Sequence, residues 1–377
     1  MDSCLTEAAE LLGYRNLKDE QISCLTEFLS GRDVFVILPT GFGKTACFTL
    51  LPFAFDKYQK RDSGNKAIII VVSPLTALII NQVEALLSRN VSAGYINSES
   101  TSDVKKNVTL GKYCIVFMGP EQLVDEWRSL LSSDVYMSRL VGLIIDEAHC
   151  VVKWGKTFRE AFTRLTEVRS TMPSHIGIMA LTATATRTLR LQVEQILGMR
   201  SPLAIIRSPD KPNLRFSNIE LGGVNNYGVP NIFHHILIEL REKLTDLQRV
   251  MIFCKVKTDC PKLYTFFKAC LGRYFTHPPG ASTDLVECRL VDMFFKGTRT
   301  HVKQRIIENF TKDSCLRIII CTDAFGMGVN CPDVRLVIHY GVPSDVETYV
   351  QQIGRSGRDG KESYAVLLHS KKEDGEL

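Results

Sequence analysis

Short, continuous apolar runs rich in β-branched residues recur along the first half of the chain, and each is followed by turn residues and a segment of helical length. Runs that are apolar at every position suit strands buried on both faces of a sheet, as parallel strands are. Strands that alternate with helices in this way predict βαβ units. The predicted strands of this first set are 33–39, 67–74, 113–120, 141–146 and 176–184.

The same alternation begins again in the second half of the chain. Its predicted strands are 249–255, 288–295, 316–322, 334–340 and 363–369. Between the two sets lies a stretch rich in proline and glycine with little helical period, where we place a linker. Because 377 residues exceed one ordinary core, we predict two α/β domains, 1–206 and 230–377, joined by a linker at 207–229.

Composition and charge change this picture little. With 45% apolar and 23% charged residues, the chain has the composition of an ordinary soluble globular protein. No apolar run reaches the roughly 20 residues that span a bilayer, and the acidic N-terminus lacks the basic region of a signal peptide. We therefore expect an intracellular protein without a membrane segment. The net charge of +5 permits a polyanionic partner without requiring one.

The 12 cysteines are scattered, and no two of them form a C-x-x-C pair. Zinc sites usually contain such closely spaced pairs, so we expect no zinc site in this chain. Several of the cysteines lie inside apolar runs, as Cys254 and Cys321 do. This placement favours buried, reduced thiols in an intracellular protein.

The stretch VILPTGFGKTAC, residues 36–47, places a Gly-rich turn between a predicted strand and a predicted helix. Gly41 and Gly43 allow backbone conformations and close approaches that a Cβ atom forbids, so the N–H groups of residues 40–45 can cradle phosphate. Lys44 would meet the β- and γ-phosphates, and the Thr45 hydroxyl would bind Mg²⁺. Leu38 stands where the strict motif has its first glycine, which leaves open a simple strand-to-helix turn with a surface lysine.

Asp146 and Glu147 follow directly after another predicted strand. In an open α/β sheet ligands bind at the carboxyl ends of the strands, so we expect these carboxylates to lie close to the Gly-rich turn. Asp146 could then hold Mg²⁺ through water, and Glu147 could act as general base toward the water that attacks the γ-phosphate. The alternative, an exposed acidic loop, explains the two acids but not their pairing with the turn.

These motifs resemble those of superfamily 2 helicases, and specifically those of RecQ-type DNA helicases. LGYRNLKDEQ (12–21) resembles the adenine-recognition motif; the resemblance implies that Tyr14 stacks on adenine and that the Gln21 amide pairs with its edge. Lys18 and Thr40 are also implied to contact the nucleotide. The resemblance extends through VVSPLTALIINQV (motif Ia), FMGPEQL (motif Ib), DEAH (motif II) and ALTATAT (motif III).

The second domain continues the resemblance with MIFCKVK (motif IV), CTDAFGMGVN (motif V) and QQIGRSGRDG (motif VI). The family implies two RecA-like domains, each a largely parallel sheet flanked by helices, with the nucleotide site in the cleft between them. It also implies that Gln351 lies near the nucleotide and that Arg355 or Arg358, or both, reach the γ-phosphate as an arginine finger. The alternative for these residues is a solvated basic loop.

The resemblance also implies contacts with single-stranded DNA, which require phosphate contacts and stacking platforms. The positions expected to contact phosphate are Ser73, Pro74, Thr182 and Thr184. The stretch after DEAH resembles an aromatic-rich loop that couples strand binding to hydrolysis, and Trp154, Phe158 and Arg159 match its apolar and basic positions. Phe158 and Phe162 have i,i+4 spacing, however, which also describes one face of a core helix.

The chain departs from the family pattern at several places. Lys156 and Thr157 replace the usual His-Asp of the aromatic-rich loop, which puts the coupling of DNA binding to hydrolysis in doubt. Phe42 replaces a small residue of the phosphate loop and could crowd the nucleotide, and Lys18 replaces an arginine. In the second domain 295–296 replaces a more polar motif, and 272–287 reads as a surface insertion.

Taken together, the resemblance implies a monomeric, ATP- and Mg²⁺-dependent 3′–5′ DNA helicase acting on single-stranded and on forked or duplex DNA in repair, recombination or replication. It would work in the nucleus of a eukaryote, and otherwise in the cytoplasm or nucleoid. Because the chain ends at Leu377, soon after motif VI, the expectation is firmer for a motor core than for efficient unwinding. Two alternatives stay open: a catalytically weakened DNA-binding or scaffold paralogue, and an RNA-directed helicase.

Overall fold

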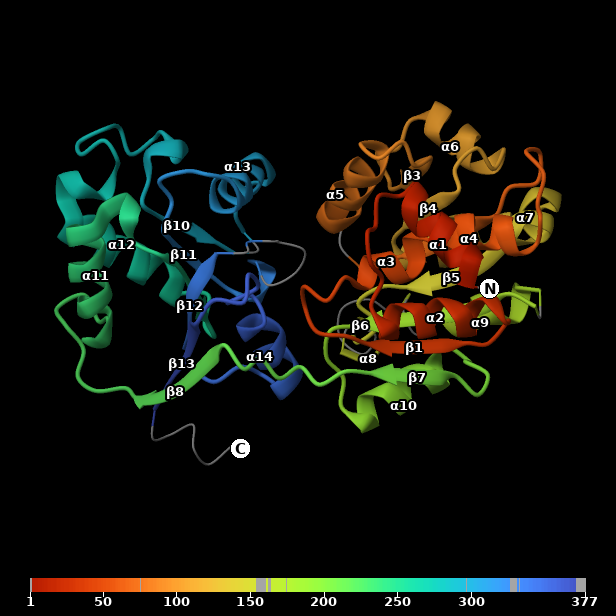
Figure 1. Cartoon of the computed structure of the whole chain (residues 1–377). Helices are drawn as coiled ribbons and strands as arrows, with labels where there is room; N and C mark the ends of the chain where they lie inside the picture. The colour runs from red at the N-terminus through yellow and green to blue at the C-terminus, as the bar shows by residue number, and fades with distance from the viewer. Residues whose placement is uncertain are drawn as a thin grey trace. The chain divides into compact units, whose positions relative to one another are not determined.

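The computed structural model describes residues 2–74, 76–153, 161, 164–173, 175–295, 297–325, 331 and 333–370. The chain folds into two compact units, Met1–Pro209 and Asp210–Leu377, which we call unit 1 and unit 2 (Figure 1). Each unit is built on one sheet whose described neighbouring strands all run parallel. The predicted class, two α/β domains with parallel sheets, is therefore confirmed.

The sheet of unit 1 has the strand order β3-β4-β2-β5-β6-β1-β7. Its strands are β1 (Val34–Ile37), β2 (Ile68–Val72), β3 (Ala93–Ile96), β4 (Ile115–Met118), β5 (Leu140–Ile145), β6 (Gly177–Thr182) and β7 (Leu203–Ile206). The central strands are buried at every position and apolar except at Thr182, the last residue of β6, as strands covered on both faces should be. Because every pair is parallel, β1, β6 and β5 end side by side at the same edge of the sheet.

The helices of unit 1 are α1 (Asp2–Leu11), α2 (Asp19–Leu29), α3 (Lys44–Thr49), α4 (Leu51–Tyr58), α5 (Thr76–Leu87), α6 (Ser102–Thr109), α7 (Asp134–Arg139), α8 (Cys150–Lys153), α9 (Leu165–Thr171) and α10 (Arg187–Ile196). A short π-helix, η1 (Gln122–Glu126), and a short 3₁₀-helix, η2 (Arg128–Ser132), follow β4. Several helices begin where a hydroxyl caps an N–H group, as Thr186 does for Leu189 at the start of α10. Pro52, which has no N–H to donate, lies where α3 gives way to α4.

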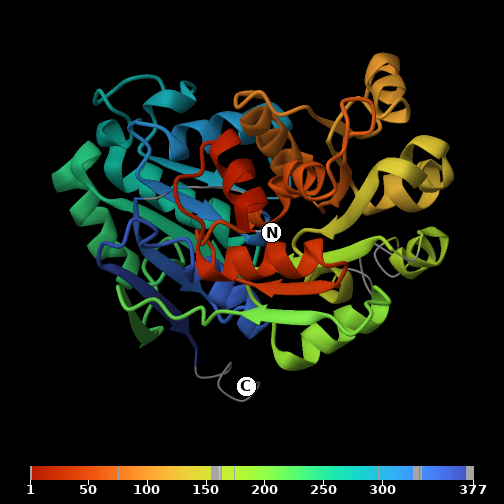
Figure 2. The ribbon, with the colours of Figure 1, turned by 45° about the vertical axis from the view of Figure 1, so that its right-hand side comes forward.

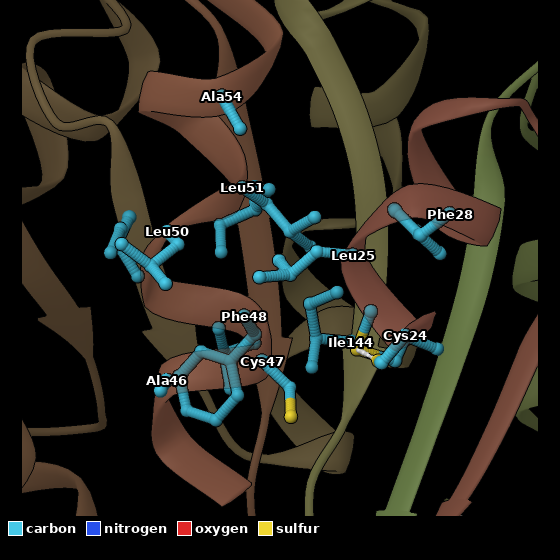
Figure 3. Packing of buried hydrophobic residues seen from close by; sticks show 14 of the residues in the cluster. Cys24, Leu25, Phe28, Ala46, Cys47, Phe48, Leu50, Leu51, Ala54 and Ile144 are labelled. Carbon is cyan, nitrogen blue, oxygen red and sulfur yellow. Dashed lines mark hydrogen bonds between the residues drawn. The ribbon is translucent and has the colours of Figure 1, made fainter. Parts of the chain in front are cut away.

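Helices α1 to α5 contribute to one large apolar cluster against the sheet of unit 1. Figures 1 and 2 both show α2 lying along β1 and β7. In the close view of this cluster, Leu25 of α2 and Leu51 of α4 lie next to each other near Ile144 of β5, and none of the three side chains is exposed (Figure 3). Packing of this kind holds α3, and with it the turn that precedes it, firmly against the sheet.

The sheet of unit 2 has the order β10-β11-β9-β12-β13-β8. Its strands are β8 (Leu214–Glu220), β9 (Arg249–Cys254), β10 (Val291–Phe294), β11 (Ile318–Cys321), β12 (Val334–Tyr340) and β13 (Ser363–His369), and its helices are α11 (Ile232–Lys243), α12 (Asp259–Leu271), α13 (Thr300–Thr311) and α14 (Val346–Ile353). Val250 and Ile252 pack with α11 and α12, whereas Met251 and Phe253 pack with α13 and α14. Alternate residues of β9 thus point to opposite faces of the sheet and contribute to the apolar cluster on each face.

Each of the ten predicted strands overlaps an observed one, and three short or polar strands were not predicted: β3, β7 and β8. The strand β8 lies inside 207–229, the segment assigned to the linker, and pairs with β13 along its whole length. Only its first residue, Leu214, is buried, because β8 is an edge strand with polar residues facing solvent. A pattern based on continuous apolar runs does not detect such a strand. None of the described helices is both long and apolar enough to cross a membrane.

A buried carboxylate fastens the amino-terminal edge of the sheet of unit 1. Asp33, directly before β1, is 3% exposed, and its Oδ1 accepts a hydrogen bond from the N–H of Ile178 in β6 at 2.7 Å. Its Oδ2 accepts one from the N–H of Arg200, just before β7, at 2.6 Å and lies 3.5 Å from the guanidinium of Arg169. One side chain thus joins the strand that precedes the Gly-rich turn to both of its neighbours.

A chain of three polar side chains leads from the core of unit 2 to its surface. His339 of β12 is 1% exposed, and its Nε2 lies 2.8 Å from Oε1 of Gln352 on α14. The amide nitrogen of Gln352 donates to Asp323 Oδ1, just after β11, at 2.7 Å. Burial lowers the pKa of His339 to about 4, and its ring stacks on Phe253 with centroids 5.5 Å apart. The imidazole is therefore neutral and donates from Nε2 to the amide oxygen.

Replacing Asp33 by alanine is expected to destabilise unit 1 by about 3–5 kcal/mol, because it removes the carboxylate that pairs with buried Arg169 and accepts two backbone N–H groups. The urea midpoint, followed by tryptophan fluorescence, measures this, since both tryptophans lie in unit 1. Asp62→Ala is a matched control, because Asp62 also accepts two N–H groups, from Gly64 and Asn65, but on the exposed surface. We expect it to cost under about 1 kcal/mol. Equal losses of unfolding free energy in both variants would show that the buried contacts of Asp33 do not stabilise unit 1 as expected.

Unit 2 is expected to lose stability in acid because of His339. The unfolded chain binds a proton near the ordinary histidine pKa of about 6.5, whereas the folded chain binds it only near pH 4. The contribution is therefore complete above pH of about 6.5 and declines as the pH falls toward about 4, by on the order of 3 kcal/mol.

Native-state hydrogen exchange of β12 peptides, corrected for the intrinsic pH dependence of exchange, measures this decline. His339→Gln keeps an N–H donor for Gln352 but cannot titrate, so its decline should be shallower. His301→Gln, at an exposed position of α13, should behave like the unmodified chain. An unchanged slope in His339→Gln would show that another group is responsible.

Candidate nucleotide and DNA site

The Gly-rich turn lies between β1 and α3 at the carboxyl edge of the sheet. Gly41 and Gly43 have φ values of 82° and 96°, which L side chains rarely adopt, and Gly43 is the N-cap of α3. A Cβ atom on Gly43 would also lie only 2.8 Å from Gln21 Nε2. The backbone conformation and the space both require glycine at position 43, as expected for a phosphate-binding turn.

Lys44, the first residue of α3, reaches back across the turn, and its Nζ donates to the carbonyl oxygen of Leu38 at 3.0 Å. The Leu38 side chain is fully buried in the core cluster of unit 1. This placement explains how leucine can occupy the position of the motif's first glycine: its side chain packs into the sheet and leaves the turn open.

Asp146 and Glu147 follow β5, which is separated from β1 only by β6. The N–H of Asp146 continues the sheet by donating to Val72 O at 2.9 Å, so the side chain starts from a fixed point at the strand end. Burial, followed by the charge of Glu147, raises the pKa of Asp146 to about 6, and the charge of Lys44 acts in the opposite direction. The structure therefore brings Lys44, Asp146 and Glu147 together, as predicted.

Two side chains that the sequence analysis did not single out support this edge. Gln82 on α5 donates from Nε2 to Asp146 Oδ2 at 3.4 Å, which connects motif Ia to motif II. His149 Nδ1 lies 3.0 Å from Thr182 Oγ1, and that hydroxyl donates to Thr184 O at 3.0 Å. Motifs II and III are thus joined through a buried histidine. His149 belongs to the DEAH signature and could have been found from it, whereas the sequence pattern of α5 gives no signal for Gln82.

Two of the predicted DNA contacts, Thr182 and Thr184, are buried with this histidine at the end of β6. Ser73 is also buried, at the end of β2, and its hydroxyl has no hydrogen-bond partner among the described residues. Pro74 follows it directly, at the start of the turn toward α5. All four positions therefore lie at the carboxyl edge of the sheet, but all four are buried, so their side chains offer no surface for direct contact with DNA in this structure.

The predicted adenine residues lie on the other side of the turn. Gln21 is 5% exposed; its Oε1 accepts from the N–H of Lys18 at 2.9 Å, and its Nε2 donates to Gly43 O at 2.9 Å. A longer bond of 3.4 Å joins Nε2 to Phe42 O. Tyr14 is half-buried, and its hydroxyl lies 3.4 Å from Thr49 Oγ1 on α3. The glutamine therefore holds the phosphate loop directly.

Phe42, the large residue of the phosphate loop that could crowd the nucleotide, is packed against cations. Lys18 Nζ lies 3.8 Å from the centre of the Phe42 ring and donates to the Phe42 carbonyl at 3.1 Å. The guanidinium of Arg207 lies 5.2 Å from the same ring and pairs with Glu20. The large side chain thus has its own partners beside the turn, in a cation–π arrangement.

In unit 2, motif VI forms the end of α14 and the turn that follows it. Gln351 is 8% exposed and Arg355 is 3% exposed. Arg358 is half-buried, and burial lowers its pKa. The N–H of Gly357 donates to Val334 O at 3.1 Å, which anchors this arginine turn at the start of β12. A solvated basic loop, the alternative considered above, does not describe these buried positions.

Trp154, Phe158 and Arg159 lie outside the described residues, as do the two departures from the family pattern in the same loop, Lys156 and Thr157. The end of motif V, 326–330, also lies outside them.

Two family matches cover most of the chain. The DEAD/DEAH box helicase family matches residues 18–191, and the helicase conserved C-terminal domain matches residues 233–360. The first match falls within unit 1 and the second within unit 2.

Individual relatives align over nearly the whole chain. The ATP-dependent DNA helicase RecQ of Pasteurella multocida is 28% identical over 363 residues, which are 95% of this chain and 51% of the relative. A protein of Acanthamoeba polyphaga mimivirus named as an ATP-dependent RNA helicase, R290, is 30% identical over 364 residues, which are 95% of this chain and 59% of the relative. The chain thus spans little more than half the length of these relatives.

Among solved structures, the DUF1998 helicase MrfA bound to DNA and AMPPNP superposes with a TM-score of 0.77. The match covers 98% of this chain and 50% of that chain at 16% identity, so the likeness concerns the fold. The two helicase matches fall one on each unit, and RecQ helicases align along almost the entire sequence; this chain belongs to the superfamily 2 helicases and is a RecQ-type helicase core.

Proposed function

We propose that this chain is the motor core of an ATP-dependent DNA helicase, which hydrolyses ATP to move 3′ to 5′ along single-stranded DNA and to open duplex DNA. The observation that carries the proposal is the meeting of Lys44 with Asp146 and Glu147 at one edge of a parallel sheet. A phosphate loop beside a pair of acidic residues is what nucleoside-triphosphate hydrolysis requires. The 3′–5′ direction follows from the resemblance to RecQ enzymes.

In this proposal the turn from Thr40 to Thr45 holds the phosphates of ATP. Lys44 Nζ would exchange the Leu38 carbonyl, 3.0 Å away, for phosphate oxygens. Gln21 keeps a second lone pair on Oε1, and its long bond to the Phe42 carbonyl can be exchanged for the edge of adenine. Tyr14 would stack on the base.

Mg²⁺, when bound, would neutralise charge on the phosphates. The residues fit such an ion, because Asp146 is a buried carboxylate whose pKa is raised by burial and by Glu147, and a nearby cation relieves that repulsion. Asp146 would hold the ion through water, and the Thr45 hydroxyl would bind it directly.

Glu147 is suited to orient the attacking water. Its Oε2 is buried and lies 3.4 Å from Nδ1 of His149, but among the described residues it accepts no hydrogen bond, so we propose that it accepts one from the attacking water. Its backbone has a φ of 50°, which is unusual for a residue other than glycine, asparagine or aspartate. We infer that this conformation directs the carboxylate toward the phosphate loop.

Arg355 and Arg358 would complete the site from unit 2. We propose that they approach the γ-phosphate when the two units close on ATP and that they stabilise the charge of the transition state. Gln351, one helical turn earlier, would contact the nucleotide in the same state. Repeated closing and opening of two DNA-bound units would then advance the motor along the strand.

We propose a DNA strand across the carboxyl edges of both units. Seven residues of unit 1 are proposed to form the edge that the strand follows: Ser73, Pro74, Trp154, Phe158, Arg159, Thr182 and Thr184. Ser73, Pro74, Thr182 and Thr184 are buried, so we propose that they support this edge from within. Because Thr182 contacts His149 of the DEAH motif, a strand bound at this edge would act on the hydrolytic residues through these two side chains. A DNA motor would work in the nucleus of a eukaryote or in the nucleoid of a bacterium.

The alternative of a catalytically weakened scaffold rests on Phe42 and on the replacements in the aromatic-rich loop. The RecQ relatives do not favour it, and Phe42 is accommodated by Lys18 and Arg207. An RNA substrate is a second candidate, because one relative is named as an RNA helicase.

Loss of the Glu147 carboxylate or of the Lys44 ammonium should nearly abolish ATP turnover. Glu147→Gln is expected to lower kcat by about 100-fold or more while ATP binding persists. Lys44→Ala is expected to lower kcat and to weaken ATP binding as well. ATPase rates with single-stranded DNA and the affinity for a fluorescent ADP analogue measure these effects. Lys57→Ala is the matched control, since Lys57 is an exposed lysine that pairs with Glu7 on the surface. Hydrolysis by Glu147→Gln at the normal rate would refute the assignment.

The ATPase activity should be stimulated at least several-fold more by single-stranded DNA than by RNA of the same sequence and length. Stimulation should weaken as salt rises from about 50 to 200 mM, because phosphate contacts release counterions. Duplexes with a 3′ or a 5′ single-stranded tail test the direction, and only the 3′-tailed substrate should be opened. Equal stimulation by RNA would support the RNA-directed alternative instead.

A further inference from the structure

The first residues of unit 2 are bonded to the turn that carries the two arginines. Lys211 Nζ donates to the carbonyl oxygens of Gly354 at 2.7 Å and of Ser356 at 3.0 Å. These carbonyls flank Arg355, so a single ammonium group holds the backbone on both sides of that arginine. An ammonium at the end of α14 also satisfies carbonyl groups that the helix leaves unpaired.

Asn213 holds the rest of the same turn. Its Nδ2 donates to Gly357 O at 2.9 Å and to Lys361 O at 2.8 Å. Gly357 has a φ of 61°, and a Cβ atom there would lie 2.4 Å from Asn213 Nδ2. The contact is therefore close enough to require glycine in the turn. Two side chains from one short segment thus fasten the turn from Gly354 to Lys361.

The charged form of Lys211 is disfavoured by its surroundings. Burial lowers the pKa of Lys211 to about 8, and the charges of Arg358 and Arg355 act in the same direction. These like charges repel one another, and the two hydrogen bonds to the carbonyls of Gly354 and Ser356 hold the Lys211 ammonium in place against that repulsion.

The same connecting segment is attached to the phosphate loop at its other end. The N–H of Arg207, the residue after β7, donates to Ile37 O at 2.9 Å, at the end of β1. Its guanidinium pairs with Glu20 and lies against the ring of Phe42 in the phosphate loop. The contacts of Arg207 lie within unit 1, and those of Lys211 lie within unit 2.

Only Ser208, Pro209 and Asp210 lie between these two attachments. Four Cα-to-Cα steps extend to at most about 14 Å, and proline reduces the freedom of the chain further. A connector of this length limits how far the two attachments can separate, so a larger displacement of one must move the other. The phosphate loop and the arginine turn are thus joined through the chain itself.

We propose that Lys211 is a positioning residue for ATP hydrolysis, which holds the turn of Arg355 and Arg358 and, through the short connector to Arg207, couples that turn to the phosphate loop. This inference rests on the proposed ATPase function. Lys211 itself does not touch the reacting atoms; it acts through the backbone that carries the arginines.

Lys211→Met tests the proposal because it keeps a long apolar side chain but removes both hydrogen bonds and the charge. We expect kcat of the DNA-stimulated ATPase to fall about 10- to 100-fold, since a small misplacement of a catalytic group has effects of this size. The KM for ATP and the affinity for a fluorescent ADP analogue should change less than about threefold, because the phosphate loop is intact. Lys211→Arg can still donate to both carbonyls and should recover most of the rate.

Arg215→Met is the matched control. Arg215 lies on β8 beside the same turn, but it is exposed and pairs with Glu362 at 2.9 Å. Its loss removes one cation without touching the carbonyls of the arginine turn. We expect a kcat within about twofold of the unmodified chain.

A second variant keeps the test decisive if Lys211→Met does not fold, which hydrogen exchange of β13 peptides would reveal. Two glycines inserted between Ser208 and Pro209 lengthen the connector and leave both attachments intact. The coupling predicts a lower kcat with unchanged ADP affinity for this insertion as well. The proposal is overturned if folded Lys211→Met, or the insertion where Lys211→Met is unfolded, hydrolyses ATP at the normal rate. A lack of ATPase activity in the unmodified chain would instead refute the proposed function, and this inference with it.

Discussion

Parallel pairing of β5, β6 and β1 is the constraint on which the candidate site depends. It brings three strand ends to one edge, so that Asp146, Thr182 and the turn before Lys44 meet although they are far apart in the sequence. Burial then makes the arrangement electrostatically expensive, because two adjacent carboxylates lose solvent together and the pKa of Asp146 rises. Lys44 offsets part of this repulsion. A site that places opposite charges in this way is prepared for a cation and a polyphosphate, which supply the charges that are still needed.

In unit 2 the corresponding constraint is how the turn that carries Arg355 and Arg358 is held in place. Its arginines must be presented at the end of a helix, where backbone carbonyls lack partners. Lys211 and Asn213 satisfy several of these carbonyls from a segment that is continuous with the first unit. Gln352, the neighbour of Gln351, joins α14 to β12 and to the start of motif V through His339 and Asp323. The arginine turn is thus held through α14 by the polar chain of His339, Gln352 and Asp323, and directly by Lys211 and Asn213.

Much of the fold could be predicted from the chain alone, because buried parallel strands leave an unmistakable run of apolar residues. The strands β3, β7 and β8 were not predicted. Short strands and edge strands are covered on fewer sides, so they do not need a continuous run of apolar residues. The same reasoning explains why 207–229 read as a linker although it contains β8. For the site, the glycines, Lys44 and the acidic pair were predictable because their chemistry demands particular residue types at fixed spacing.

What the sequence by itself determined is therefore the set of reacting groups and the order in which they follow the strands. Only the tertiary structure decided which side chains support them: Gln82 on Asp146, His149 on Thr182, Gln21 on Gly43 and Lys211 on the arginine turn. Local sequence carries no record of these pairs, since each joins residues that are distant along the chain and of types that are common on any surface. A hydrogen bond between such residues exists only once the sheet has brought their backbones within reach, and so it follows from the fold.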